Sequence, residues 1–137
     1  MDETCAKAVQ KLVLADSEIL KTLGIKIVGV ATEAVVLSMR IRPDMVNSQG
    51  ICHGGFLFGL SDTAAAYSVA ALNGIPVTTE ANISYIAPAL LDDNVTANAI
   101  VQEKTSKMLY IATRVQNQRG ETLAIHRCTC INRGTCV

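Results

Sequence analysis

The sequence predicts an α+β fold in which an antiparallel β-sheet wraps around one long central α-helix. Segments that alternate apolar and polar residues follow one another with only turns between them, which is typical of an antiparallel sheet. One further segment, from Gly54 or Gly55 to Asn73, is apolar on all sides, as expected for a helix buried in a core. Its small residues would let the sheet approach closely: Gly59, Ala64, Ala65, Ala66, Ala70 and Ala71.

Periodicity and turn residues place the other elements in chain order. Apolar residues at helical spacing predict an N-terminal helix over 5–23, broken near Asp16 and Ser17 and ended by Gly24. In the segment 77–86, apolar and polar residues alternate with the period of a strand. Strands are expected at 25–30, 35–41, 77–86, 95–103, 109–116 and 122–131, and the tail 133–137 is expected to fray.

Length and composition indicate one globular domain spanning residues 1–137. Hydrophobic residues make up 50% of the chain and charged residues 18%, a balance that excludes a disordered protein. The 12 basic residues equal the 12 acidic ones, and aromatic residues make up only 4%. Neither bulk charge nor a stacking surface for bases is present, so nucleic-acid and membrane-surface binding are not expected.

The cysteines and the N-terminus point to a reducing compartment. The five cysteines form an odd set, and their spacing matches neither a disulfide framework nor a zinc site. The start of the chain lacks the basic and apolar regions of a signal peptide, and no apolar run approaches transmembrane length. We therefore expect a soluble cytoplasmic protein with reduced thiols and no bound metal.

A single carboxylate, Asp62, lies within the apolar helix segment. A buried charge is costly unless it is paired, hydrogen-bonded or used, so Asp62 is the first candidate for chemistry. The alternative is that Asp62 caps a helix starting at Thr63, since Asp is a favoured cap residue. That alternative would leave 56–60 as a wholly apolar loop, which is unusual because loops run over the surface.

The residues around Asp62 resemble a known family. The residues that carry the resemblance are Asn47, His53-Gly54-Gly55, Phe58, Leu60 and Asp62-Thr63-Ala64. Together they are similar to the hotdog-fold acyl-CoA thioesterases, and most similar to the PaaI branch of phenylacetic acid degradation. The resemblance covers nearly the whole chain, including the strand at 82–85 and Pro88 after it.

The resemblance implies a role for each matching residue. Asp62 would be the general base or nucleophile, and the Gly54 backbone N–H would polarise the thioester carbonyl. Asn47 and His53 would place the water and the thioester. In the family, the carboxylate of one subunit faces the other three groups of its partner, so a dimer is required. The usual assembly is a homotetramer of two such dimers.

The substrate would be an acyl-CoA thioester, of the aryl or arylacetyl class. The expected substrate contacts are Gly55, Thr63, and Thr78 or its neighbour Thr79. Coenzyme A is part of the substrate, and no metal or redox cofactor is required. The physical chemistry agrees, because a helix N-terminus is a ready hydrogen-bond donor to developing negative charge. Apolar surroundings also strengthen a carboxylate as a base.

Simpler interpretations exist for most of these residues, and two other functions compete. Asn47 and His53 could be ordinary turn residues, Cys52 a packing residue and His126 a structural one. A hydratase on the same fold usually places a His a few residues after its Asp, but the first His after Asp62 is His126. A non-catalytic acyl-CoA-binding protein is the third possibility, because a fold alone does not determine function.

Overall fold

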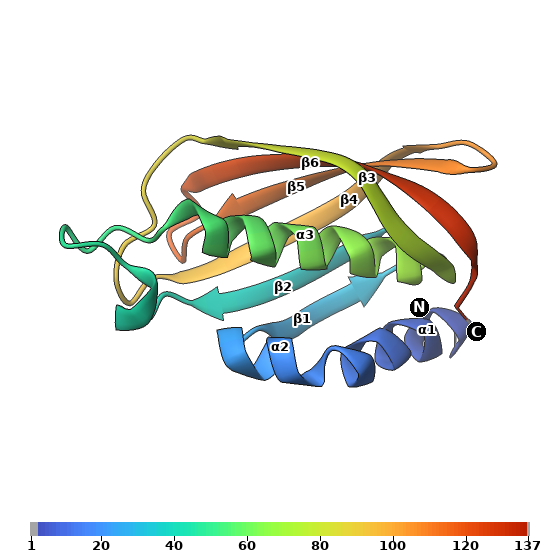
Figure 1. The fold of residues 1–137 in the computed structure, drawn as a ribbon, viewed down its shortest axis with the longest axis horizontal. Helices are drawn as coiled ribbons and strands as arrows, with labels where there is room; N and C mark the ends of the chain where they lie inside the picture. Colours follow the sequence, from blue (N-terminus) through green and yellow to red (C-terminus); the bar gives the residue numbers. More distant parts are fainter. Residues whose placement is uncertain (1–2, 137) are drawn as a thin grey trace.

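A computed structural model describes residues 3–136 as a six-stranded antiparallel sheet curled around a long helix, α3 (Figure 1). The strand order is β1-β2-β4-β5-β6-β3, so β1 and β3 are the edges of the sheet. This confirms the predicted α+β hotdog fold. The elements are α1 (Glu3–Ala15), α2 (Ser17–Leu23), β1 (Lys26–Ala31), β2 (Ala34–Arg40), the 3₁₀ turn η1 (Pro43–Met45), α3 (Gly54–Ala70), β3 (Gly74–Tyr85), β4 (Asn94–Lys104), β5 (Met108–Gln116) and β6 (Thr122–Thr135).

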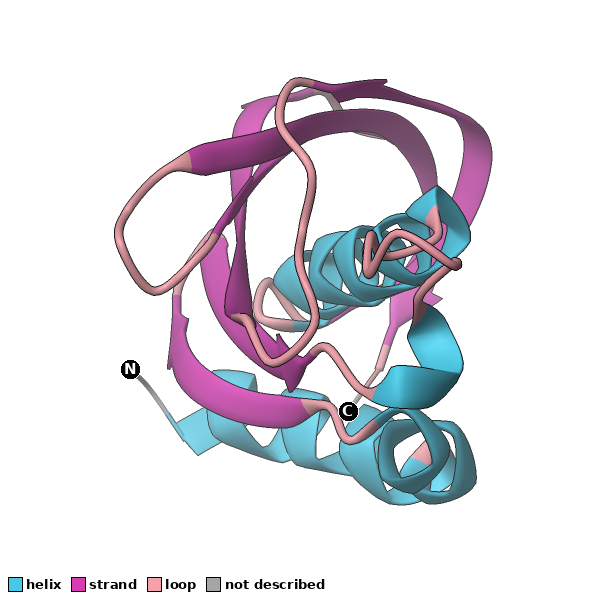
Figure 2. Cartoon of the chain, turned by 90° about the vertical axis from the view of Figure 1, so that its left-hand side faces the viewer, coloured by secondary structure: helices cyan, strands magenta, loops and turns pink. Residues whose placement is uncertain are grey.

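Helix α3 lies inside the curve of the sheet, as Figure 2 shows along its axis. Its inward residues Leu57, Leu60 and Ala64 are fully or almost fully buried. The helix begins at Gly54, eight residues before Asp62, so the alternative in which Asp62 caps a helix starting at Thr63 is wrong. Asp62 therefore lies within the regular, hydrogen-bonded body of a core helix.

The N-terminal helices lie along one side of this core. The predicted break is confirmed, because α1 ends at Ala15 and α2 begins at Ser17. The Tyr67 hydroxyl of α3 donates a hydrogen bond to the Asp16 carboxylate at 2.8 Å, which ties this junction to the core. Gly24 ends α2 with φ of +68°, a conformation that Gly adopts without strain.

Strand β3 is exposed along most of its length, on both faces. The period-two pattern led us to expect a half-buried strand, but of its 12 residues only Gly74 is buried, and only Pro76 and Ile83 are partly covered. A register shift between Thr78 and Glu80 interrupts the pairing with β6. The sequence pattern identifies a strand, but it cannot show that this strand lies at the edge of the sheet with only one neighbouring strand.

The C-terminal end of the chain is more ordered than the sequence suggested. Strand β6 continues to Thr135, so the fraying expected for 133–137 is wrong for 133–136, and Val137 lies outside the described residues. The Cys136 N–H donates to the Asn73 carbonyl at 2.9 Å. Helix α3 also ends at Ala70, three residues before the expected end, because the following residues turn into β3.

All five cysteines are buried and free of disulfide bonds. Within residues 3–136, no helix combines the length and apolar character needed to cross a bilayer.

Candidate active site

The first turn of α3 presents backbone donors beside a tyrosine ring. His53 precedes the helix in an extended conformation and Gly54 is its first residue. A methyl group placed on Gly54 would lie 2.5 Å from both Cζ and Oη of Tyr85, so a larger residue here would require the Tyr85 ring to move. A methyl group on Gly55, by contrast, would meet no heavy atom within 4 Å. The helix N-terminus is therefore open beside Gly55 and closed beside Gly54.

The loop before α3 is held by its own hydrogen bonds. Asn47 accepts hydrogen bonds at its side-chain oxygen from the N–H groups of Gln49, at 2.9 Å, and Ile51, at 3.1 Å. The His53 N–H donates to the Met45 carbonyl at 2.8 Å. The Asn47 oxygen thus has the turn role that was the simpler interpretation, and only its NH₂ group can serve a substrate. The His53 side chain is exposed.

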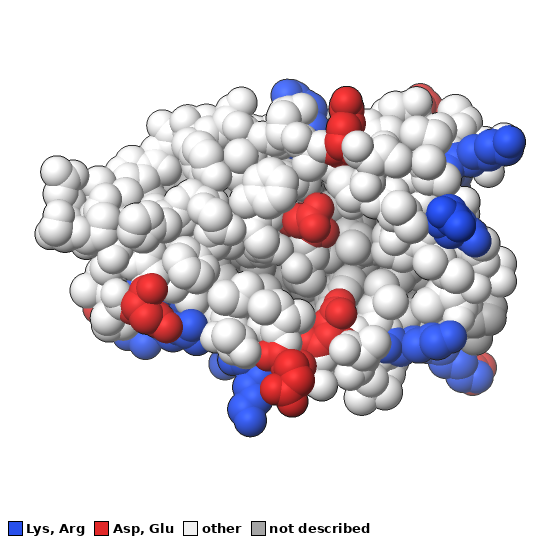
Figure 3. All heavy atoms as spheres, in the orientation of Figure 1, with Lys and Arg blue, Asp and Glu red and all other residues white. Residues whose placement is uncertain are grey.

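Asp62 lies two turns farther along α3 and is half-buried. It is the only charged residue of the helix. Eight residues separate it from Gly54, which corresponds to about 12 Å along the helix axis. In the space-filling view of Figure 3, acidic atoms lie near the middle of this face, in the region of α3, and others lie toward its rim beside Lys and Arg atoms.

The side chains of β6 lie beneath Asp62. A hydrogen bond from the Cys128 thiol to Cys130 raises the pKa of Cys128 and lowers that of Cys130. The negative charge of Asp62 raises the pKa of both thiols as a smaller contribution, which places the carboxylate near this strand. Cys52 is separate from this group, and burial raises its pKa to about 11. A neutral, buried Cys52 agrees with a packing role.

The three candidate threonines make different contacts. The hydroxyl of Thr78 lies 3.6 Å from the sulfur of Cys130, a thiol whose pKa the Asp62 charge raises as a smaller contribution. Thr79 instead donates to the Thr129 carbonyl at 3.1 Å, and Thr63 donates to the Gly59 carbonyl at 2.8 Å. Between the two neighbours, the geometry therefore favours Thr78 as the residue that accompanies Asp62.

His126 is a neighbour of this group that sequence reasoning treated only as structural. It is completely buried, and its ring meets that of Phe58 edge-on, with 5.0 Å between centroids and 79° between planes. Burial lowers the pKa of His126, and the Asp62 carboxylate partly offsets this. The alternation of β6 could have indicated that His126 shares the inner face with Cys128 and Cys130, because these residues are two apart.

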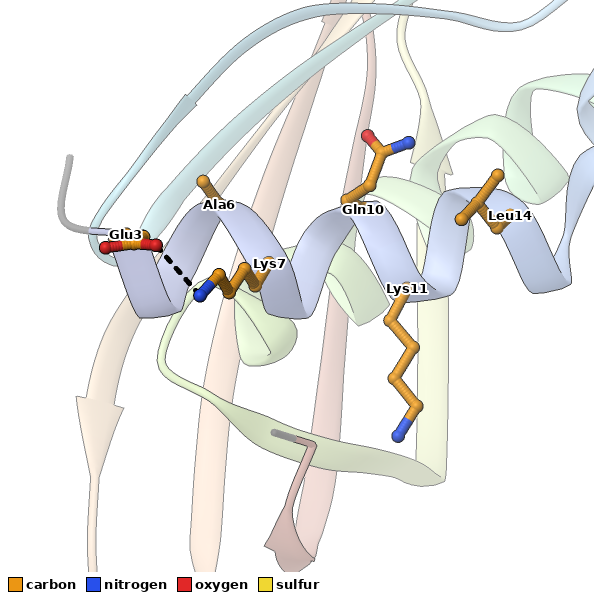
Figure 4. Close-up of a pocket in the computed structure, with 6 residues that line it drawn as sticks. All are labelled: Glu3, Ala6, Lys7, Gln10, Lys11 and Leu14. Carbon is orange, nitrogen blue, oxygen red and sulfur yellow. Dashed lines mark ion pairs between the residues drawn. The ribbon is translucent and has the colours of Figure 1, made fainter.

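The described chain thus holds two groups rather than one assembled site. Gly54, Gly55, His53 and Asn47 lie at the start of α3, while Asp62 and Thr78 lie around its middle. A shallow, open hollow lies elsewhere, on α1, and all its lining residues belong to that helix (Figure 4). The hollow therefore contains no residue of either group.

Comparison with known proteins gives this arrangement a family. The thioesterase superfamily model matches residues 49–124. Acyl-coenzyme A thioesterase PaaI of Escherichia coli K12 is 32% identical over 107 residues, which cover 78% of this chain and 76% of that protein.

Solved structures agree. The structure of the E. coli PaaI protein, from the phenylacetic acid degradation operon, superimposes with a TM-score of 0.89 at 28% identity, covering 97% of this chain and 98% of that one. A hypothetical thioesterase from Streptococcus pneumoniae, solved with coenzyme A, shares the fold with a TM-score of 0.77 at 24% identity, covering 81% of this chain and 90% of that one. The predicted resemblance is therefore confirmed, and the chain belongs to the thioesterase superfamily.

Proposed function

We propose that this protein hydrolyses acyl-CoA thioesters, with Asp62 as general base or nucleophile and the Gly54 N–H as donor to the thioester carbonyl. The observation that carries the proposal is the half-buried Asp62 carboxylate, the only charge on the core helix whose N-terminus begins at Gly54. The related E. coli protein is named an acyl-coenzyme A thioesterase, which supports the same activity here.

Hydrolysis needs a base at the attacking water and a hydrogen-bond donor at the carbonyl oxygen, and Asp62 and the Gly54 N–H would supply these two roles. Asp62 accepts a proton from water as the water oxygen attacks the thioester carbon, and negative charge moves to the carbonyl oxygen. The Gly54 N–H stabilises that charge, a contact worth about 3 kcal/mol in other enzymes. The carbon–sulfur bond then breaks, and the CoA thiolate takes the proton from Asp62. The products are the free acid and CoA.

A direct attack by Asp62 is the other route, and isotope labelling identifies it when water opens the intermediate at the aspartyl carbon. In that route the carboxylate forms an anhydride with the acyl group, which water then opens. A single turnover in ¹⁸O water gives acid labelled from the solvent if Asp62 is a base. If water opens the anhydride at the aspartyl carbon, the first turnover gives unlabelled acid, and the label appears on Asp62.

We infer that the working site lies between two copies of the chain. A base that acts through one water must lie within two hydrogen-bond lengths of the reacting carbon, or roughly 6 Å. The separation of Gly54 and Asp62 along one helix is about twice that. Asp62 and Thr78 of one subunit would therefore face Gly54, His53 and Asn47 of another.

The exposed β3 edge supports this assembly. An unpaired strand edge is a template for pairing with another chain, and monomeric proteins usually cover or shorten such edges. Here the edge is 12 residues long, and Ile75, Val77 and Tyr85 expose large apolar side chains on it. A homodimer that covers β3, and a tetramer of two such dimers, would bury these residues.

The substrate class we propose is aryl- or arylacetyl-CoA. The similarity to a protein of a phenylacetic acid degradation operon supports this choice. Gly55 is suited to a substrate contact because the space beside it is open, and Thr63 and Thr78 lie near Asp62. Thr79 remains a weaker candidate, because its hydroxyl is engaged with the strand backbone.

A substrate panel tests the activity directly. Thiol release should be measured with a disulfide reagent for phenylacetyl-, benzoyl-, acetyl- and palmitoyl-CoA. We expect the aryl thioesters to give the highest kcat/KM. Binding without thiol release would instead indicate an acyl-CoA-binding protein, and addition of water to crotonyl-CoA would indicate a hydratase.

Subunit mixing tests the shared site. Asp62→Asn and Gly54→Ala subunits should each be inactive alone. After unfolding and refolding together, random pairing would give about a quarter of the wild-type number of sites, because half the dimers carry one intact site. Refolding Asp62→Asn with Asp62→Ala is the matched control and should stay inactive. Failure of the first pair to recover activity would contradict a site between copies.

A further inference from the structure

Three buried polar atoms on the inner face of the sheet have no hydrogen-bond partner within the described residues. They are Oγ1 of Thr113 and both ring nitrogens, Nδ1 and Nε2, of His126. Both side chains are completely buried. Thr113 and His126 are directly opposite each other in the β5–β6 ladder, so their side chains are close neighbours on one face. The unpartnered atoms therefore belong to one place in the core.

These three atoms indicate a bound molecule that supplies the missing hydrogen bonds. Buried polar atoms in native proteins are almost always hydrogen-bonded, to protein or to ordered water, and leaving them unpaired is costly. A buried water needs at least two polar partners, and this place offers three polar atoms. The apolar alternative, a dry packing contact, would be better served by Leu at 126 and Val at 113.

Asp62 is the charged group nearest to this place on the facing helix. The His126 ring meets Phe58, and Asp62 follows Phe58 by one helical turn, so the two side chains project from the same stripe of α3. The Asp62 charge acts on His126, Cys128 and Cys130. With its pKa lowered by burial, His126 is neutral at pH 7, with one ring N–H donor and one ring acceptor.

We propose that His126 and Thr113 hold one buried water molecule that hydrogen-bonds to the inner side of the Asp62 carboxylate, which makes His126 a positioning residue for Asp62. The Thr113 hydroxyl and one ring N–H of His126 donate to the water, and the water donates to Asp62. This arrangement gives Thr113 and one ring nitrogen a partner and leaves the outer carboxylate oxygen for the reacting water. The inference rests on the proposed role of Asp62.

Isosteric variants separate positioning from packing. His126→Leu should lower kcat by about 10- to 100-fold, the effect of one hydrogen bond to a charged group, with little change in KM. Its melting temperature should be unchanged or higher, because an apolar side chain replaces an unpaired polar one. Thr113→Val should also lower kcat, by a smaller factor. Thr113→Ser should keep the wild-type kcat, because Ser keeps the hydroxyl.

A double variant tests whether His126 acts through Asp62. If it does, Asp62→Asn/His126→Leu should be no less active than Asp62→Asn, because the water then has no base to orient. Losses that add, or wild-type kcat in His126→Leu, would overturn the inference while leaving hydrolysis by Asp62 intact. Full activity in Asp62→Asn would overturn both.

A comparison of two Thr113 variants and a crystal structure test the inference independently of His126→Leu. If His126→Leu does not fold, the comparison of Thr113→Val with Thr113→Ser decides, since equal kcat values for the two would contradict the proposal. A high-resolution crystal structure of the wild-type protein should show a water between His126 and Asp62. Its absence, with His126 still unpartnered, would also overturn the inference.

Discussion

Helices α1 and α3 differ in where their charged side chains lie. Helix α1 buries three of its 13 residues and carries its charges in water, where Lys7 and Glu3 pair 2.8 Å apart. Helix α3 buries nine of 17 residues and carries a single carboxylate. The residues drawn in Figure 4 line a shallow, open surface on α1, whereas the half-buried carboxylate lies on α3. A charge is informative where burial makes it costly, so the carboxylate of α3 is a better candidate for chemistry than the exposed charges of α1.

The largest expected effect comes from removing the α3 charge. Asp62→Asn should lower kcat/KM by about 10²- to 10⁴-fold, the usual contribution of a general base. Thiol release measures this, and circular dichroism and sedimentation should show an intact, assembled protein. Glu18→Gln, which neutralises an exposed acid on α2, is the matched control and should behave as wild type. Equal activity in the two variants would refute the contrast between the helices.

A smaller loss is expected at the start of α3. The methyl group of Gly54→Ala would clash with the Tyr85 ring and displace either the ring or the first turn, so kcat should fall about 10²- to 10³-fold, as when an oxyanion donor is lost. Gly59→Ala is the control for stability. No heavy atom lies within 4 Å of a methyl group added there, so the close approach of the sheet expected at Gly59 is wrong, and the variant should not lower the melting temperature. A destabilised Gly59→Ala would show that α3 tolerates no added methyl group, whatever its position.

The hydrogen bond between Tyr67 of α3 and Asp16, at the junction of α1 and α2, should affect stability and not activity. Tyr67→Phe removes the hydrogen bond to Asp16 and should lower the free energy of unfolding by about 1 kcal/mol, since Asp16 is half-buried and water can replace the lost partner. Urea titration measures the change. The value of kcat/KM should stay at the wild-type level, and a clear loss would give the α1–α2 junction a role in catalysis.

The smallest effect is expected on α1 itself. Lys7→Ala and Glu3→Ala break an exposed ion pair one helical turn apart, which is worth less than about 1 kcal/mol and is screened by salt. Both variants should match wild type in thiol release and lie within a degree or two of its melting temperature. A strong loss of activity in either would mean that the α1 hollow contributes to function.

Local sequence signals were enough for most of the fold. The alternation of β4 and β5, the turn at Gly24 and the uninterrupted apolar character of α3 each reflect a local rule, and the structure agrees with all three. The expectation that Asp62 is buried, which came from the conflict between a charge and its apolar helix, is confirmed only in part, because the residue is half-buried.

What could not be predicted depends on contacts between distant segments. The position of His126 under α3 follows from packing between β6 and Phe58, which are far apart in the chain. The exposure of β3 follows from its place at the sheet edge, and the pairing of 132–135 follows from an early start of β3 at Gly74. The engagement of the Asn47 oxygen with its own turn needed coordinates, because Asn serves turns and substrates with the same atoms.

The strand order has a consequence for biosynthesis. Strand β6 follows all the other described strands in the chain and is inserted between β5 and β3, so β3 has no partner among the described strands until β6 has emerged. Until then α3 lacks the part of its cover that β6 provides, and an apolar edge is open to aggregation. Nascent chains stalled before residue 122 should therefore recruit chaperones, and the emergence of β6 should be the step that closes the sheet.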